Sequence, residues 1–352
     1  MSDFEYTTIE QQIQKLKKQH LIINNEKKAI QALRTYGYYN IINGYRDPYI
    51  TRTYNEKIYS PDVSFEQIYS LFILDRKLRN AVMFSMTDLE EHLRAVVAEI
   101  IGESFGTKHD LYLSKTNYRD RHVRNIKFTR ENILKSLTDI AESSYKEPVR
   151  YYREKHHIVP PWILLKATDF GTLINYIKIF LRPQRESLVS ALYDTDSLQL
   201  NMDELKDLLS DTLSMCLEYR NLAAHGGRIY NYVPHSLIRN FNTSTTHGGL
   251  GILLKCLRFF SYSIPFSSLN NAIISALSSY CTEYPNDISR IENALGCKLE
   301  MHTLAYVNIK TKIFHSDPHC SGSTNLSKVF LDDAIAGNFV PCKRCVTKDY
   351  YS

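Results

Sequence analysis

The chain has 352 residues with a formal net charge of +5, and 43% of its residues are hydrophobic. This length is sufficient for two domains, and the apolar content supports a real core. No stretch of about 18 uncharged apolar residues occurs, which excludes a membrane-spanning helix. The first residues also lack the order of a signal peptide, so we expect a cytoplasmic protein whose seven cysteines are reduced or bind metal.

Helical signals begin near the N-terminus. Thr7 and Glu10 have the spacing of a capping box, which predicts the start of a first helix. Asn24 or Asn25 can cap a second helix that runs to about residue 36. Residues 44–63 show neither the apolar period of a helix nor that of a strand, and we expect an irregular connection there.

A much longer helix is predicted from Ser64 to about Ile101. Its apolar residues recur at three- and four-residue steps, as on one buried helix face: Leu71, Leu78, Val82, Met86, Leu89 and Leu93. Charged residues interrupt this apolar pattern at five positions: Asp75, Arg76, Arg79, Glu90 and Arg94. We expect them to form buried ion pairs that fix the helix register, and the lining of a cleft is the alternative.

The middle of the chain is rich in basic residues. Helices are expected over about 118–143, 162–181 and 185–193. Basic side chains beside aromatic ones suit an RNA backbone with unstacked bases. A solvated helix face is the alternative. The RNA contacts that we predict here are Arg121, Arg124, Lys127, Arg150 and Arg153.

The next helix carries the most informative residues of the sequence at its end. Asp203 can cap its start, and Gly226 is placed to be the left-handed residue after its end. Asn221 and His225 lie four residues apart and share a helix face, with Arg220 one position away. An imidazole exchanges protons near neutral pH, and a guanidinium holds a phosphate by a planar fork. This combination suits metal-independent phosphodiester chemistry on RNA, whereas a mere helix-end network is the alternative.

The segment RNLAAHGGRIYN, Arg220–Asn231, resembles the signature of the Abi family of bacterial abortive-infection proteins, the AbiD/AbiF-like group within the HEPN superfamily. Further segments agree in the expected order: YGYY at 36–39, FEQIY at 65–69, LEEHLR at 89–94, PPW at 160–162 and FGTL at 170–173. The resemblance covers about residues 8–235. It implies a HEPN-type helical bundle, a homodimer that brings two Arg/His motifs together, and RNA as substrate or ligand.

The resemblance also implies roles for individual residues. In an endoribonuclease of this type, His225 is the general base or acid for attack of the ribose 2′-hydroxyl, and Arg220 stabilises the charge on phosphate. Asn221 orients the imidazole or the phosphate. Arg228, Tyr230 and Asn231 are expected RNA contacts, and the products carry a 2′,3′-cyclic phosphate or a 3′-phosphate. The alternatives are a non-catalytic protein that holds a small structured regulatory RNA, and a protein-interaction scaffold.

The composition changes near residue 296, so we expect a helical domain over 1–295 and a small α+β module over 296–352. At least one more helix is expected within 248–280, whereas 306–314 alternates as a strand does and 331–337 is helix-like.

A set of sulfur and imidazole ligands lies in this last module. His315 or His319 can join Cys320, Cys342 and Cys345 as four ligands of a tetrahedral zinc site. The spacing resembles the small zinc-binding module of the Ada type over about 303–348, in which the His follows a strand, and this favours His315. We expect a structural Zn²⁺ with no open position, in a module that could contact nucleic acid or a partner.

Overall fold

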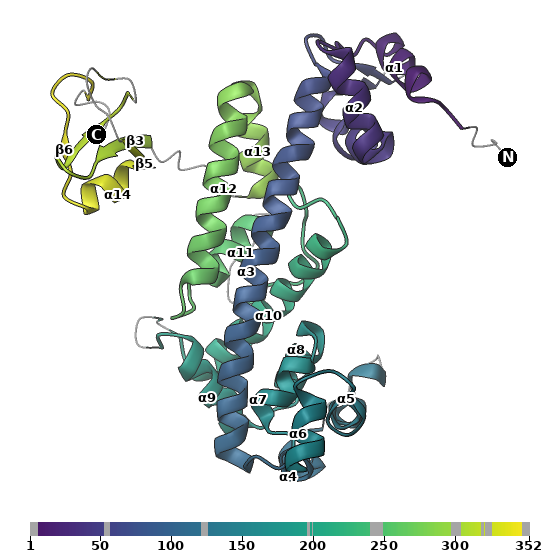
Figure 1. Ribbon diagram of the computed structural model, residues 1–352, viewed down its shortest axis with the longest axis vertical. Coiled ribbons are helices and arrows are strands. Elements are labelled where there is room, and N and C mark those ends of the chain that lie inside the picture. The colour runs from purple at the N-terminus through teal and green to yellow at the C-terminus, as the bar shows by residue number, and fades with distance from the viewer. Residues whose placement is uncertain are drawn as a thin grey trace. The chain divides into compact units, whose positions relative to one another are not determined.

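The computed structural model describes residues 6–52, 57–120, 126–195, 198, 200–239, 249–296, 304–317, 320 and 326–346. It divides into two compact units, Met1–Cys297 and Lys298–Ser352. The first is built mainly of helices, and the second holds a small sheet with one helix (Figure 1). The prediction of a mainly α fold followed by a small α+β module is therefore confirmed. None of the helices in the described segments combines the length and the apolar character that crossing a bilayer requires.

The helices of the first unit, in chain order, are α1 (Ile9–Lys18), α2 (Glu26–Tyr36), α3 (Phe65–Phe105), α4 (His109–Tyr112), α5 (Arg130–Ser143), α6 (Val149–His156), α7 (Pro161–Leu164), α8 (Phe170–Lys178), α9 (Arg182–Leu192), α10 (Met202–Ala224), α11 (Gly249–Leu257), α12 (Ile264–Glu283) and α13 (Ile288–Leu295). Short π- and 3₁₀-helical turns join them: η1 (Tyr39–Asn43), η2 (Asp47–Tyr49), η3 (Lys115–Asn117), η4 (Ile126–Phe128), η5 (Leu165–Ala167) and η6 (Pro285–Asp287). The antiparallel strands β1 (Ile50–Arg52) and β2 (Lys57–Tyr59) form a hairpin.

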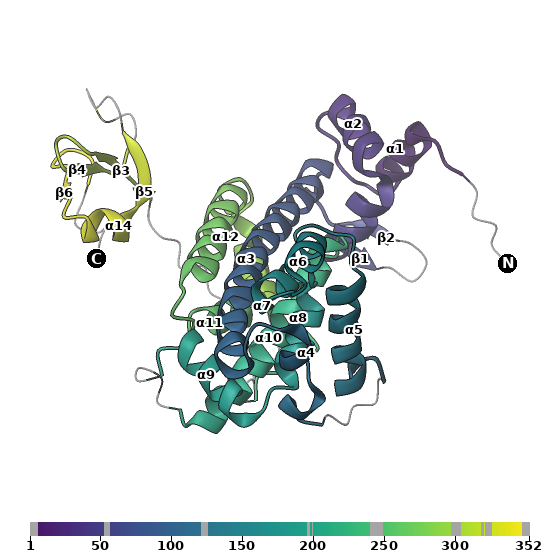
Figure 2. The same ribbon diagram turned by 60° about the horizontal axis from the view of Figure 1, so that its bottom comes forward.

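The long helix α3 is the central element of this unit. The Ser64 side chain caps its start by accepting a hydrogen bond from the Gln67 N–H at 3.1 Å. Its predicted apolar face is fully buried, at Leu71, Leu78, Val82, Met86, Leu89 and Leu93. The helix packs against α7, α9, α10 and α12, and Figures 1 and 2 both show α12 alongside α3. The position of α10 against α3 decides where the residues at its end lie.

Several helix starts differ from the sequence-based prediction, and in each case another residue makes the capping hydrogen bond. Thr8, not Thr7, caps α1 and forms the capping box. Asn201, not Asp203, caps α10 and accepts from two backbone N–H groups. The helix expected after residue 118 begins only at Arg130, where Thr129 caps it. The periodic apolar pattern fixes that a helix exists, whereas its first residue depends on which polar side chain is oriented to cap it.

Two further segments differ from the sequence-based prediction. The segment 44–63 contains the β1–β2 hairpin, so it is not irregular throughout. The helix predicted over 162–181 is interrupted before α8, because Asp169 turns its carboxylate to the Thr172 N–H at 2.9 Å and starts a new helix. The basic stretch that precedes Pro160 forms α6.

The second unit is a four-stranded sheet with the strand order β5–β3–β4–β6. Its elements are β3 (Leu304–Asn308), β4 (Ile313–His315), β5 (Ser327–Phe330), α14 (Leu331–Ala336) and β6 (Val340–Pro341). The single strand predicted over 306–314 is a hairpin, because the Asn308 side chain accepts from the N–H groups of Lys310 and Thr311 and forms a turn. A small apolar core lies between the sheet and α14.

Candidate active site and metal centre

The end of α10 is shaped by a glycine turn. Ala224 is the last residue of the helix and His225 is its C-cap, and Gly226 follows with a φ of +71°, in the left-handed region that glycine adopts freely. The Gly226 N–H donates to the Ala223 carbonyl at 3.2 Å, and the Gly227 N–H to the Leu222 carbonyl at 2.8 Å. This pair of bonds is the Schellman pattern, which satisfies the last carbonyls of the helix. It stops the helix at His225 and leaves that side chain exposed.

Gly227 is required for a different reason, namely the close approach of Leu222. A Cβ at position 227 would lie 2.2 Å from the Leu222 Cδ1 and 2.8 Å from its Cγ. We expect Gly227→Ala to lower the free energy of unfolding by about 1–3 kcal/mol, the usual cost of overpacking. Urea denaturation of the purified chain measures this.

The control for that prediction is a double-mutant cycle with Leu222→Ala, which removes the atoms that the new Cβ would meet. Gly227→Ala should cost at least about 0.5 kcal/mol less in the Leu222→Ala background. An equal cost in both backgrounds would rule out the close contact as the reason for a glycine here.

A buried carboxylate holds the segment that follows this turn. Asp75 of α3 is fully buried, and its Oδ1 accepts from the N–H groups of Ile229 at 2.9 Å and Tyr230 at 2.7 Å. Its Oδ2 accepts from the Tyr45 hydroxyl at 2.6 Å. Burial raises the pKa of Asp75 above its usual value, although these donors oppose the shift. One side chain therefore fixes the path of the backbone after His225.

Arg79, one turn along α3, completes this attachment. Its Nη1 lies 3.2 Å from the Asp75 Oδ2, which is one of the ion pairs expected within this helix. The same nitrogen donates to the carbonyls of Gly226 at 3.1 Å and Gly227 at 3.3 Å. The two residues of α3 thus attach both the turn and the segment after it to the central helix.

Arg220 and Asn221 lie together on the last turns of α10. The Arg220 Nη1 donates to the Asn221 Oδ1 at 3.2 Å. Both line a cavity of about 300 Å³, which they share with polar residues of α5, of α8 and of the N-cap of α8: Asn132, Ser136, Asp169, Thr172 and Asn175. Burial raises the pKa of Glu90, and the nearby charges of Arg94 and Arg220 oppose that rise. Arg220 therefore lies near one carboxylate of α3 and reaches a polar cavity.

His225 lines a second and larger cavity, of about 580 Å³. Its neighbours there come from α2, η1, α3 and the turn after α10, and they include Tyr36, Tyr39, Asn40, Asn43, Arg76, Arg79 and Arg228. The three predicted catalytic residues thus lie together at one helix end. Within one chain, however, Arg220 and Asn221 line one cavity and His225 lines the other.

The residues after the turn differ in exposure. Arg228 is exposed and donates from Nη1 to the Gly44 carbonyl at 2.6 Å. Asn231 is exposed as well. Tyr230 is buried, and its ring stacks on that of Tyr45 with centroids 5.8 Å apart. We therefore assign Tyr230 to the anchoring of this segment and retain Arg228 and Asn231 as candidate RNA contacts.

The predicted basic cluster is only partly described. Lys127 lines the Arg220 cavity. Arg150 pairs with Glu147 at 2.7 Å, and Arg153 donates to the Ser144 carbonyl at 2.9 Å, beyond the end of α5. Arg121 and Arg124 lie outside the described residues.

The cavity beside His225 was predicted only in part, through the alternative that charged residues of the long helix line a cleft. Ion pairs were the first expectation for Arg76 and Arg79; Arg79 pairs with Asp75, and both arginines also line this cavity. The YGYY segment at 36–39 was the other indication of a binding site, because tyrosines exposed there would lie beside basic residues of the long helix.

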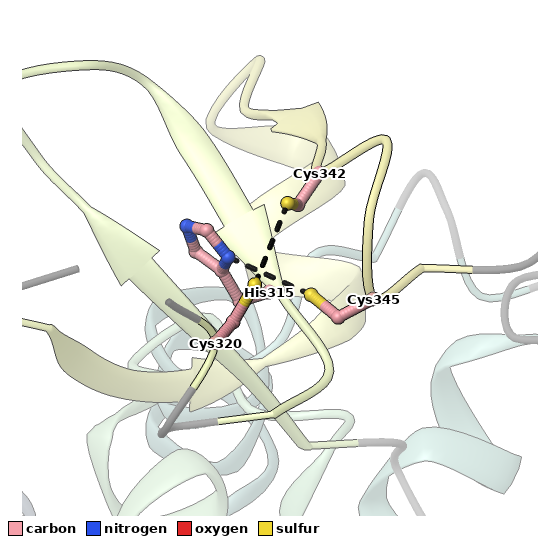
Figure 3. A group of neighbouring side chains, drawn as sticks. All are labelled: His315, Cys320, Cys342 and Cys345. Atoms are coloured by element: carbon pink, nitrogen blue, oxygen red, sulfur yellow. Dashed lines mark hydrogen bonds between the residues drawn. The ribbon is translucent and has the colours of Figure 1, made fainter. Parts of the chain in front are cut away.

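The four predicted metal ligands converge in the second unit (Figure 3). His315 ends β4, and Cys342 follows β6, whose pairing with β4 brings the Cys342 N–H to the Phe314 carbonyl at 2.8 Å. The four ligand atoms all lie within 4.8 Å of one another. The Cys320 and Cys342 sulfurs are 3.9 Å apart, and the Cys345 Sγ is 3.6 Å from the His315 Nδ1.

The distance between the Cys320 and Cys342 sulfurs and that between the Cys345 sulfur and the His315 nitrogen are close to those around a tetrahedral zinc ion. Zn–S bonds of about 2.3 Å and Zn–N bonds of about 2.0–2.1 Å give tetrahedron edges of about 3.8 Å between two sulfurs and about 3.6 Å between sulfur and nitrogen. Against the effect of burial, the backbone N–H groups of Asp317 and Ser316 lower the pKa of the Cys345 thiol to about 6. Thiolate is the form that binds metal. His319, the competing ligand, lies outside the described residues.

The first unit is thus helical, with Arg220, Asn221 and His225 at the end of α10, and the second unit holds four residues that could bind a metal ion. The model of the Abi-like protein family matches residues 31–231, which is more than half of the chain and contains the segment from α3 to Tyr230. The chain therefore belongs to the Abi-like protein family. Searches of curated proteins and of solved structures found no match. Family membership suggests a role in abortive infection, the bacterial defence against phage.

Proposed function

We propose that this protein is a metal-independent endoribonuclease of HEPN type that acts on RNA in abortive infection. The observation that carries the proposal is the helix end itself. The glycine turn, held to α3 by Asp75 and Arg79, presents an exposed imidazole one turn after an Arg220–Asn221 pair. These are the groups that the reaction needs, namely a proton carrier near neutral pH and a fixed positive charge for phosphate.

In the proposed reaction the ribose 2′-oxygen attacks the adjacent phosphorus. The bond from phosphorus to the 2′-oxygen forms while the bond to the leaving 5′-oxygen breaks. His225 as base takes the 2′-hydroxyl proton, and an acid returns a proton to the 5′-oxygen. Arg220 stabilises the added negative charge on the phosphate oxygens, and Asn221 orients the group that it contacts.

The proton balance supports a homodimer. The reaction needs one base and one acid at the same phosphate, and each chain supplies one His225. A second copy that places its own helix end nearby would provide the other imidazole. This arrangement would also bring side chains that line two cavities in one chain to a single phosphodiester.

The test is a cleavage assay on mixed cellular RNA in EDTA with the wild-type chain, His225→Ala and Arg220→Ala. We expect each substitution to slow cleavage by about 100-fold or more, because general acid–base catalysis and charge stabilisation each contribute that much. The matched control is His235→Ala, which removes another exposed imidazole ten positions further along. It should cleave as the wild type does.

Equal cleavage by wild type and His225→Ala would contradict the proposal and indicate another site or a contaminant. The second candidate function is a non-catalytic protein that holds a small structured RNA, and the separation of Arg220 and His225 into two cavities favours it over catalysis by a single chain. No cleavage by any variant, together with RNA binding that Arg220→Ala weakens, would establish that second function.

A further inference from the structure

The cavity beside His225 has the size and position of a ligand site. Its volume of about 580 Å³ lies within the range of about 300–1,000 Å³ that is usual for small-molecule sites. Its walls come from α2, η1, α3 and the turn after α10. Because that turn is fixed by Asp75 and Arg79, the cavity is held open next to the exposed imidazole.

The charge of this cavity is positive and largely uncompensated. Arg76 donates from Nη1 to the Tyr36 hydroxyl at 2.6 Å, and Arg228 donates to the Gly44 carbonyl at 2.6 Å, so both guanidinium groups bind neutral oxygens. The lining residues include no carboxylate. Among the described residues, only Arg79 of the three arginines forms an ion pair, with Asp75. Two guanidinium forks facing one space are suited to a phosphate.

An exposed aromatic ring stands in the same cavity. Tyr39, on the π-helical turn η1, is 75% exposed although it lines the cavity. The neighbouring Tyr36 ring is covered by the Arg76 guanidinium, whose carbon lies 4.7 Å from the ring centroid. Tyr39 therefore offers a free face, and stacking of a base on such a face is a common way of binding single-stranded nucleic acid. A ligand that needs both phosphate and flat-ring binding is a nucleotide.

We propose that this cavity is a nucleotide subsite that holds one unpaired nucleotide of a bound RNA next to His225. Arg76 and Arg228 bind its phosphate, and the Tyr39 ring stacks on its base. The base must be unpaired, because a base within a duplex is already stacked on both faces. The subsite deepens the proposed function, and it rests on that function only in that RNA is taken as the ligand. It can be tested separately, because RNA binding is measured without cleavage.

The experiment measures binding of a short fluorescent single-stranded RNA by anisotropy, in EDTA, with the full chain carrying His225→Ala to prevent cleavage. Adding Tyr39→Ala should weaken binding about tenfold, the usual effect of losing one stacked base, whereas Tyr39→Phe should retain binding. Adding Arg228→Gln, which keeps a donor for the Gly44 carbonyl but removes the charge, should lessen the slope of log affinity against log salt by about 0.7.

The matched controls are Tyr6→Ala and Arg258→Ala, at exposed positions outside the cavity, which should bind as the His225→Ala parent does. Three results would overturn the subsite: unchanged binding by both the Tyr39→Ala and the Arg228→Gln chains, equal affinity for duplex and single-stranded RNA, or tight binding of AMP without binding of RNA. The third result would assign the cavity to a free nucleotide.

The two proposals fail separately. If wild type cleaves RNA in EDTA but Tyr39→Ala and Arg228→Gln bind normally, the subsite is wrong and the nuclease stands. If wild type does not cleave but these substitutions weaken binding as expected, the subsite stands and the nuclease is wrong.

Discussion

Replacing Asp75 with alanine is expected to lower the free energy of unfolding by about 3–5 kcal/mol, the cost of removing one partner from a buried charged network. The substitution would leave the N–H groups of Ile229 and Tyr230 and the Tyr45 hydroxyl buried without their acceptor. It would also leave Arg79, whose side chain is largely buried, without its carboxylate. Urea denaturation followed by circular dichroism measures the change.

Two variants control this prediction. Asp75→Asn keeps the shape and one acceptor oxygen, so it should cost less than Asp75→Ala. Asp139→Ala removes an exposed carboxylate on another helix and should change stability by no more than about 0.5 kcal/mol. If Asp75→Ala were as stable as Asp139→Ala, the hydrogen bonds to the segment after His225 would not be what holds that segment in place.

Removing metal from the C-terminal module should unfold that module and leave the helical unit folded. The module has a small apolar core, built around Ala305, Val307, Phe314, Leu331 and Ala334, and such units need a metal or disulfides to fold. Structural zinc sites contribute about 10–16 kcal/mol of apparent binding free energy near pH 7. We expect one bound zinc per chain by native mass spectrometry, and loss of the module's dispersed NMR signals after chelation or in Cys342→Ser.

The matched control for the metal site is Cys281→Ala, which changes a buried cysteine on α12 that is not part of the four-ligand group. This variant should keep its zinc. A chain that contains no metal when purified, and whose module signals are unchanged by chelator, would contradict the assignment of a structural zinc site.

The sequence predicted best those features that repeat along the chain or depend on a single residue. The apolar face of α3 is indicated by six residues, so a change at any one of them would leave the periodic pattern recognisable. The end of α10 depends on Gly226, whose positive φ only glycine adopts without strain. The spacing of His315, Cys320, Cys342 and Cys345 likewise predicted that these ligands would converge.

Features that depend on contacts between distant segments could not be predicted in the same way. Asp75 was expected to form an ion pair, but nothing in its neighbourhood in the sequence indicates that it accepts from backbone groups about 150 positions away. The cavity beside His225 combines η1, α3 and the turn after α10, and only the packed fold brings them together. Tyr230 was expected to contact RNA because it lies in the family signature. Its burial against Tyr45, a residue distant in the sequence, could not be predicted from that signature.

The most direct test of the central proposal is end-group analysis of a defined single-stranded RNA that the protein cleaves, in EDTA, beside the same RNA with a 2′-deoxy sugar at the cleaved position. We predict products with a 2′,3′-cyclic phosphate or 3′-phosphate and a 5′-hydroxyl, and no cleavage at the 2′-deoxy position. Cleavage at the 2′-deoxy position, or products with 5′-phosphate ends, would contradict attack by the ribose 2′-hydroxyl and with it the role proposed for His225.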